Sequence, residues 1–272
     1  MIDPAIYKDA RGIFYRETLF GRLCSALAVT TIQADVNTLY QSLHYYGNEV
    51  SGPSVPLSLR RSIVVEVLTA RTNADIIAIK TTYKNTFNED LERRIVPIFG
   101  DYQFAHMIQS ILTASRDEEQ TSTYSVEDDV ETLYESAEAR FGSDPAIFFS
   151  VLSTRPFQHL NKVFALYTAT HKKDLLEVAH SEFSSNIKTL IINTIKTIEN
   201  RPKFIAEQLE GTMWGIGTRN WKLIRLIVRN RFELKEIKQE FLARYRYSLY
   251  ERIRGDTQYW YRKMLLATVG RD

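Results

Sequence analysis

The sequence of 272 residues contains a single cysteine, Cys24, and only 11 glycines and 7 prolines. One cysteine excludes an internal disulfide framework and any zinc site built from several cysteines. The low glycine and proline content, together with 44% hydrophobic residues, excludes collagen-like structure and wholesale disorder. We therefore expect a folded protein with a sizeable core, in a reducing compartment.

Long apolar runs and enzyme motifs are also missing. No stretch approaches the ~18 uncharged apolar residues of a transmembrane helix, and the start, Met1-Ile2-Asp3-Pro4, lacks the basic and apolar regions of a secretory signal. The sequence contains no G-x-S-x-G motif, no P-loop lysine and no histidine pair with metal-ligand spacing. It therefore predicts a cytoplasmic protein that has no transmembrane segment and is not an enzyme.

The net charge of +2 conceals an uneven distribution. Residues 201–272 carry 16 Lys and Arg against 8 Asp and Glu, whereas residues 1–200 carry 19 basic against 25 acidic residues. A basic C-terminal region favours anionic partners, either an acidic lipid surface or a nucleic acid. A solvated cationic helix face explains the same charges equally well, so charge alone does not identify the partner.

What the chain does contain is an internal repeat. The segment Asp35–Ser42 returns as Asp129–Ser136, and the arginine that ends one helix recurs in register as Arg71, Arg155 and Arg229. Several apolar positions recur at the same offsets, which indicates copies of one structural unit. We expect a remnant of a first repeat followed by three complete repeats, at residues 1–33, 34–127, 128–200 and 201–272.

Each copy has the pattern of helices. In the third repeat, Val163, Leu166 and Tyr167 recur at the i, i+3 and i+4 spacing of an amphipathic helix. One such unit cannot bury its own apolar face, so the repeats must stack to form a core. We expect five short helices in each repeat, in the third near 129–137, 145–153, 157–170, 173–180 and 186–199.

A glycine loop lies between the first two helices expected in the fourth repeat. Its sequence is Met213-Trp214-Gly215-Ile216-Gly217-Thr218, and two glycines let a loop expose backbone carbonyls without obstruction. Calcium takes six to eight oxygen ligands, commonly carbonyls and a bidentate carboxylate, and Asp256 is a suitable carboxylate. The third repeat has the same arrangement, with Arg140-Phe141-Gly142-Ser143 as the loop and Glu182 at the repeat position of Asp256.

With these features the sequence resembles the annexin family over nearly its whole length. The resemblance implies an all-α right-handed superhelix of five-helix repeats and reversible, calcium-dependent binding to acidic phospholipid membranes. It also implies two sets of calcium ligands, each made of three carbonyls and one carboxylate: Met213, Gly215, Gly217 and Asp256 in the fourth repeat, and Ala137, Arg140, Gly142 and Glu182 in the third. The loop aromatics Trp214 and Phe141 either enter the lipid interface or pack against a neighbouring helix.

Several residues depart from the family pattern. Arg219 and Asn220 stand where acidic residues usually follow the glycine loop, Ile98 replaces the acid of the second repeat, and most of the first repeat is missing. These departures leave open an alternative, a calcium-insensitive helical scaffold that binds a protein, anionic lipid or RNA through its basic C-terminal repeat. Nucleic acid is the less favoured partner, and an apolar edge left by the shortened first repeat predicts self-association.

Overall fold

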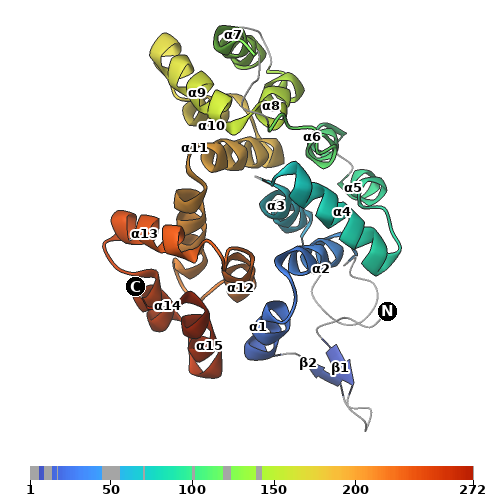
Figure 1. Ribbon diagram of the computed structural model, residues 1–272, viewed down its shortest axis with the longest axis vertical. Helices are drawn as coiled ribbons and strands as arrows, with labels where there is room; N and C mark the ends of the chain where they lie inside the picture. The colour runs from blue at the N-terminus through green and yellow to red at the C-terminus, as the bar shows by residue number, and fades with distance from the viewer. Residues whose placement is uncertain are drawn as a thin grey trace. The chain divides into compact units, whose positions relative to one another are not determined.

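The computed structural model describes residues 6–8, 14–16, 18–44, 56–69, 71–99, 102–118, 124–138 and 143–271 (Figure 1). The chain divides into two compact units. The central unit comprises residues 35–201, and the terminal unit comprises residues 1–34 and 202–272. The terminal unit thus combines the N-terminal residues 1–34 with the segment expected to be the fourth repeat, and the central unit holds the segments expected to be the second and third repeats.

The central unit is built from short helices. In the second repeat these are α2 (Thr31–His44, which begins before the unit boundary), α3 (Leu57–Leu68), α4 (Asn73–Phe87), α5 (Leu91–Phe99) and α6 (Tyr102–Leu112). In the third repeat they are α7 (Val126–Ala137), α8 (Pro145–Thr154), α9 (Phe157–His171), α10 (Leu175–Glu182) and the first part of α11 (Ser185–Met213). The five helices expected in the third repeat are confirmed, each within a few residues of its expected bounds.

Local sequence explains where these helices begin. The Ser125 side chain accepts from the backbone of Asp128 at the start of α7, and the Asp144 side chain accepts from two backbone N–H groups at the start of α8. Asp174 forms a capping box with Glu177 at the start of α10. Each cap satisfies N–H groups that have no partner inside the helix, so the polar residues between apolar runs fix the boundaries.

The terminal unit contains α1 (Leu19–Leu27), the second part of α11, α12 (Asn220–Arg229), α13 (Leu234–Tyr245), α14 (Leu249–Asp256) and α15 (Tyr259–Val269). α11 is two helices that meet at Asn200, whose φ of −161° and ψ of 94° are not helical. Pro202 follows and opens the fourth repeat. A short antiparallel pair, β1 (Ile6–Lys8) and β2 (Phe14–Arg16), precedes α1; otherwise the described chain is all-α.

The N-terminal helix α1 packs against helices of the C-terminal segment within the terminal unit. α1 lies beside α12 and α15 (Figure 1), and Leu23 on α1 is fully buried in the apolar core of this unit. Arg22 stacks on the Trp221 ring with its guanidinium carbon 3.2 Å from the ring centre, and Arg231 donates to the Val29 carbonyl at 3.0 Å. One face of α1 is therefore covered within its own unit, and self-association stays a prediction.

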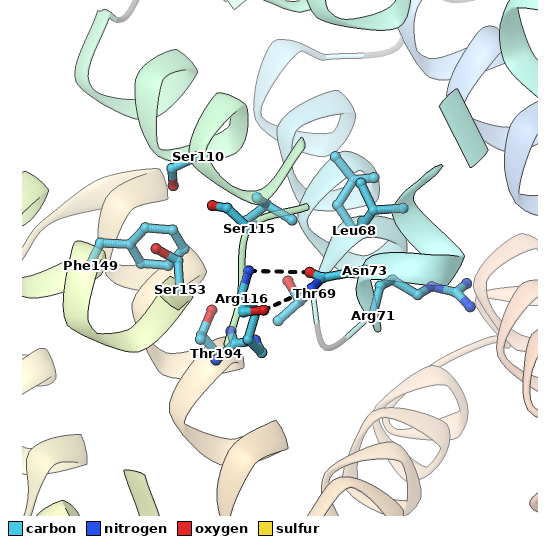
Figure 2. Close-up of a pocket in the computed structure, with 12 residues that line it drawn as sticks. Leu68, Thr69, Arg71, Asn73, Ser110, Ser115, Arg116, Phe149, Ser153 and Thr194 are labelled. Atoms are coloured by element: carbon cyan, nitrogen blue, oxygen red, sulfur yellow. Dashed lines mark hydrogen bonds between the residues drawn. The ribbon is translucent and has the colours of Figure 1, made fainter. Parts of the chain in front are cut away.

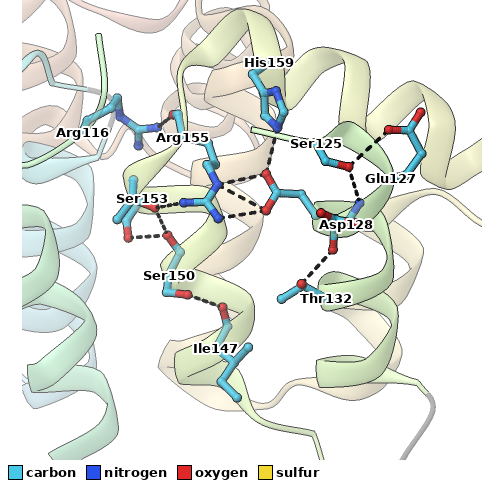
Figure 3. Close-up of polar contacts among 12 residues, drawn as sticks. Arg116, Ser125, Glu127, Asp128, Thr132, Ile147, Ser150, Ser153, Arg155 and His159 are labelled. Atoms are coloured by element: carbon cyan, nitrogen blue, oxygen red, sulfur yellow. Dashed lines mark hydrogen bonds and ion pairs between the residues drawn. The ribbon is translucent and has the colours of Figure 1, made fainter. Parts of the chain in front are cut away.

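The recurring arginines hold each repeat of the central unit together. Arg71 forms an ion pair with buried Asp35. In the third repeat Arg155 and His159 converge on the Asp129 carboxylate, with Arg155 Nε and His159 Nε2 at 2.9 and 2.8 Å from Oδ2 (Figure 3). Each ion pair ties the first helix of a repeat to the end of its second helix, so these arginines are structural.

A buried cation joins the second and third repeats. Arg116 donates to the carbonyls of Leu152 and Arg155 at 2.8 and 2.5 Å, and Asn73 bonds to the Arg116 backbone at 2.7 and 3.2 Å (Figure 2). Burial lowers the pKa of Arg116 to about 10, so it stays charged at neutral pH. The adjoining cavity of about 20 Å³ holds roughly one water molecule, which is too little space for a ligand.

Candidate functional site

The fourth-repeat loop connects α11 to α12 and depends on its two glycines. Gly215 and Gly217 have φ of 87° and 83°, a left-handed conformation that strains any residue with a Cβ atom. The Arg219 amide donates to the Thr212 carbonyl at 2.8 Å and closes the loop. At its tip Trp214 is 76% exposed, so the loop offers carbonyl oxygens and an apolar side chain to the surroundings.

The acid predicted for this site lies beside the loop. Asp256 is the last residue of α14. The Thr218 hydroxyl, at the end of the loop, donates to Asp256 Oδ2 at 2.5 Å and contacts the Asp256 carbonyl oxygen at 2.9 Å. The structure thus brings together two segments that are 38 residues apart in the chain.

Arg252 lies within the same group of oxygens, and it was not among the residues predicted for this site from the sequence. Its Nη2 donates to the Met213 carbonyl, and its Nη1 lies 3.4 Å from Asp256 Oδ1. Its Nε lies 3.2 and 3.0 Å from the two carboxylate oxygens of Glu210, a residue that is only 6% exposed. One guanidinium therefore contacts both ends of the predicted calcium-ligand set and carries its own buried counter-ion.

The surrounding charges keep Arg252 ionised. Burial alone lowers the pKa of Arg252, but the hydrogen bonds and charge of Glu210, with the charge of Asp256, outweigh this and raise it. The same Glu210 acts on Tyr247, whose pKa rises through burial and through its interaction with the carboxylate. Glu210 is thus a charged acceptor shared by an arginine and a tyrosine at the edge of the loop.

The third-repeat loop is closed by equivalent hydrogen bonds. The Ser143 hydroxyl donates to the Glu182 carbonyl at 3.1 Å, and the Thr218 hydroxyl lies at a similar distance, 2.9 Å, from the Asp256 carbonyl oxygen. The Asp144 amide donates to the Ser136 carbonyl at 2.7 Å, as Arg219 does to Thr212. Ala137 therefore occupies the place of Met213. The other predicted residues of this loop, Arg140, Phe141 and Gly142, lie outside the described residues.

The charges around the third-repeat loop differ from those of the fourth. Glu182 is exposed, and the residue one turn before it on α10 is Val178, which is fully buried. Lys173 forms an ion pair with Glu138, which also accepts a hydrogen bond from the Tyr167 hydroxyl at 2.6 Å. Val178 occupies the place of Arg252, so no side chain at this position supplies a cation to the third loop.

The repeat itself contained the signal for Arg252. α10 and α14 both start at a leucine, Leu175 and Leu249. When the two helices are aligned at these leucines, Val178 of the third repeat corresponds to Arg252 of the fourth. In the first helix of each repeat, the Ser136 hydroxyl donates to the Leu133 carbonyl as the Thr212 hydroxyl donates to that of Leu209. By this register the counterpart of Glu210 is Tyr134, so two charges replace two uncharged residues in the fourth repeat.

The two loops fit calcium to different degrees. Calcium prefers carbonyl and carboxylate oxygens. The described residues contain no cluster of three or more acidic, histidine or cysteine side chains that could hold a metal. A site built from carbonyls and one carboxylate does not need such a cluster. Glu182 is exposed and has the buried Val178, not an arginine, one turn before it on its helix, so it fits the ion. The oxygens of Met213 and Asp256 already accept hydrogen bonds from Arg252, so as arranged they do not fit it. In the second repeat Ile98, at the position of the acid, is buried.

Comparisons with known proteins agree with this architecture. The annexin family model matches residues 128–193 and 204–268. Annexin A5 of Cynops pyrrhogaster is 33% identical over 263 residues, covering 93% of this chain and 80% of that protein. The solved structure of annexin III has a TM-score of 0.85 and 27% identity, covering 94% of this chain and 76% of that one. A calcium-bound annexin (Sm)1 has a TM-score of 0.78 at 22% identity, covering 94% and 74%, and shows the fold alone.

The chain belongs to the annexin family. Its fold is the all-α annexin fold of five-helix repeats. Annexins as a class are calcium-dependent phospholipid-binding proteins and are generally not enzymes. Among the described residues no helix is both long and apolar enough to cross a bilayer.

Proposed function

We propose that this annexin binds acidic phospholipid membranes peripherally and in a calcium-dependent manner, from the cytoplasm, and that the third-repeat loop is its principal calcium site. The observation that carries the proposal is the exposed Glu182 carboxylate beside a loop that Ser143 holds in place. The carbonyls of Ala137, Arg140 and Gly142 are the accompanying ligands. Calcium, when bound, supplies the positive charge that joins these oxygens to lipid phosphates.

The fourth repeat adds contacts of another kind. The side chains of Trp214 and Ile216 are 76% and 108% exposed, and such side chains are favoured where a membrane is apolar on one side and wet on the other. Phe141 has the corresponding role in the third-repeat loop. The excess of basic residues in 201–272 adds attraction of about 1 kcal/mol for each one that lies near an anionic surface. Met213, Gly215, Gly217 and Asp256 become a second calcium set only when Arg252 is displaced.

The contact of Arg252 with Met213 and Asp256 favours a second candidate function. A chain whose loops take no calcium would be a calcium-insensitive helical scaffold, and its basic repeat would bind anionic lipid, a protein or RNA. The two functions differ in one measurable respect, which is the dependence of lipid binding on calcium.

Sedimentation with phosphatidylserine vesicles tests the proposal, with and without ~1 mM calcium and at two salt concentrations. We expect pelleting that requires calcium, reverses with chelator and is lost in Glu182→Gln. Glu131→Gln is the matched control, because Glu131 is an exposed acid of the third repeat on α7. If the wild type pellets without calcium and this pelleting weakens with salt, the proposal is contradicted and the scaffold is supported. The absence of any pelleting has the same meaning.

A further inference from the structure

We propose that Arg252 and Glu210 form a resident ion pair that occupies the metal position of the fourth-repeat loop. The guanidinium holds this loop closed without metal, and the loop does not take calcium at concentrations that fill the third-repeat loop. The proposal concerns calcium binding by the protein alone, so it does not depend on a membrane.

The guanidinium of Arg252 contacts the same oxygens that a calcium ion would need. Calcium binds oxygens at 2.3–2.6 Å and needs the Met213 carbonyl and the Asp256 carboxylate to point at a common centre. Arg252 donates to both, so the guanidinium and a calcium ion cannot hold these two oxygens together. Thr218 takes up the remaining carboxylate oxygen of Asp256 at 2.5 Å, which completes the hydrogen bonding of the acid without a metal.

Two helices, α14 and α11, hold Arg252 in this position. Ser248 caps the start of α14, and Arg252 and Asp256 lie four residues apart on this helix, so they share one face. Glu210, on α11, holds Nε through both carboxylate oxygens, which leaves the two terminal nitrogens directed at Met213 and Asp256. The side chain of Arg252 is 23% exposed and that of Glu210 8%, so the carboxylate is buried and the guanidinium is partly buried.

The third repeat lacks both members of this ion pair. The third-repeat loop has the same closing hydrogen bonds, yet its counterparts of Glu210 and Arg252 are Tyr134 and Val178, which carry no charge. Both members of the ion pair are present in one repeat and both are missing from the other. This pattern fits a pair that acts as a unit, because a buried Glu210 without Arg252 leaves an uncompensated charge.

The experiment is a calorimetric calcium titration of the full chain without lipid. In the wild-type background, Asp256→Asn is expected to leave the number of bound calcium ions unchanged, whereas Glu182→Gln is expected to abolish calcium binding. The double variant Glu210→Tyr, Arg252→Val copies the third repeat and is expected to raise binding from about one to about two ions per chain. Adding Asp256→Asn to the double variant should remove the gained ion.

Arg254→Val is the matched control for the loss of positive charge. Arg254 lies on the same helix, is exposed and pairs with Glu251 at 3.1 Å, away from the loop oxygens. We expect it to leave the calcium stoichiometry unchanged, with circular dichroism confirming that each variant is folded.

Two results would overturn the proposal. One is loss of a bound calcium in Asp256→Asn of the otherwise wild-type chain, a comparison that needs no folded double variant. The other is a folded double variant that gains no calcium. If the wild type binds no calcium but the double variant gains an ion that depends on Asp256, the resident ion pair is supported and the proposed role of the third repeat fails.

Discussion

The loops of the third and fourth repeats are closed by the same hydrogen bonds, but the residue one turn before the acid differs between them. In both, a hydroxyl at the end of the loop reaches the carbonyl of the acid-bearing residue, Glu182 or Asp256. Behind the third loop lies Val178, and behind the fourth lies Arg252, which bonds to the loop itself. We propose on this basis that the loop backbone and its acid define where a cation sits, and that the residue one turn before the acid decides whether that cation is a metal or a side chain.

The strongest way to break this comparison is to move the ion pair into the third repeat. Tyr134→Glu combined with Val178→Arg should abolish calcium-dependent pelleting with vesicles, or raise the calcium requirement at least ~10-fold, because the guanidinium then competes for the oxygens beside Glu182. Sedimentation over a calcium series measures the effect.

The control for this exchange is Tyr134→Gln with Val178→Met, which provides similar bulk without charge. It should retain calcium-dependent pelleting. A charged variant that keeps its helicity and pellets at the original calcium concentrations would show that the residue behind the loop does not select the cation.

A second prediction concerns how the two repeats hold their first helix. Asp129 binds Arg155 and His159 in the third repeat, whereas Ile205 occupies its place in the fourth. Asp129→Asn removes the buried charge that compensates Arg155 and should lower the free energy of unfolding by about 3 kcal/mol. Urea denaturation measures this loss. Asp128→Asn, an exposed change at the N-terminal end of the same helix, should cost about 0.5 kcal/mol; equal losses would refute the structural role of the ion pair.

The smallest expected effect is a pH dependence confined to the third loop. Burial acts to raise the pKa of Glu138, but its bonds to Lys173 and Tyr167 outweigh this and lower it. A carboxyl whose pKa is lower in the folded state stabilises the protein above its unfolded pKa of about 4.5, and this contribution is lost as the pH falls through the folded pKa. Glu138→Gln should therefore narrow the drop in melting temperature between pH 6 and pH 3. Glu131→Gln should follow the wild type, and an identical drop in Glu138→Gln would exclude this contribution.

Much of the fold could be predicted from the sequence because the repeats carry local signals. The third-repeat helices follow from apolar spacing and from capping residues such as Asp144 and Asp174. The proximity of the fourth-repeat loop and Asp256 was also predictable, since two copies share the same spacing. Arg252 was missed because Glu210 and Met213, two of its partners, lie on another helix. Whether its guanidinium binds Glu210, backbone carbonyls or solvent depends on packing, which the sequence does not show. Comparing it with Val178 would have revealed the exchange of an apolar for a charged residue.

Arg252 belongs to a wider use of guanidinium groups at helix ends in this protein. Arg60 bonds to the carbonyls of Ser42 and Leu43 at the end of α2, and Arg116 does the same at the end of α8. The last carbonyls of a helix have no partner within it and carry partial negative charge, so they accept a metal or an arginine equally. A tethered arginine has a fixed local concentration, whereas calcium rises and falls with a signal. If the proposed ion pair is resident, the end of α11 is held by Arg252 at every calcium concentration.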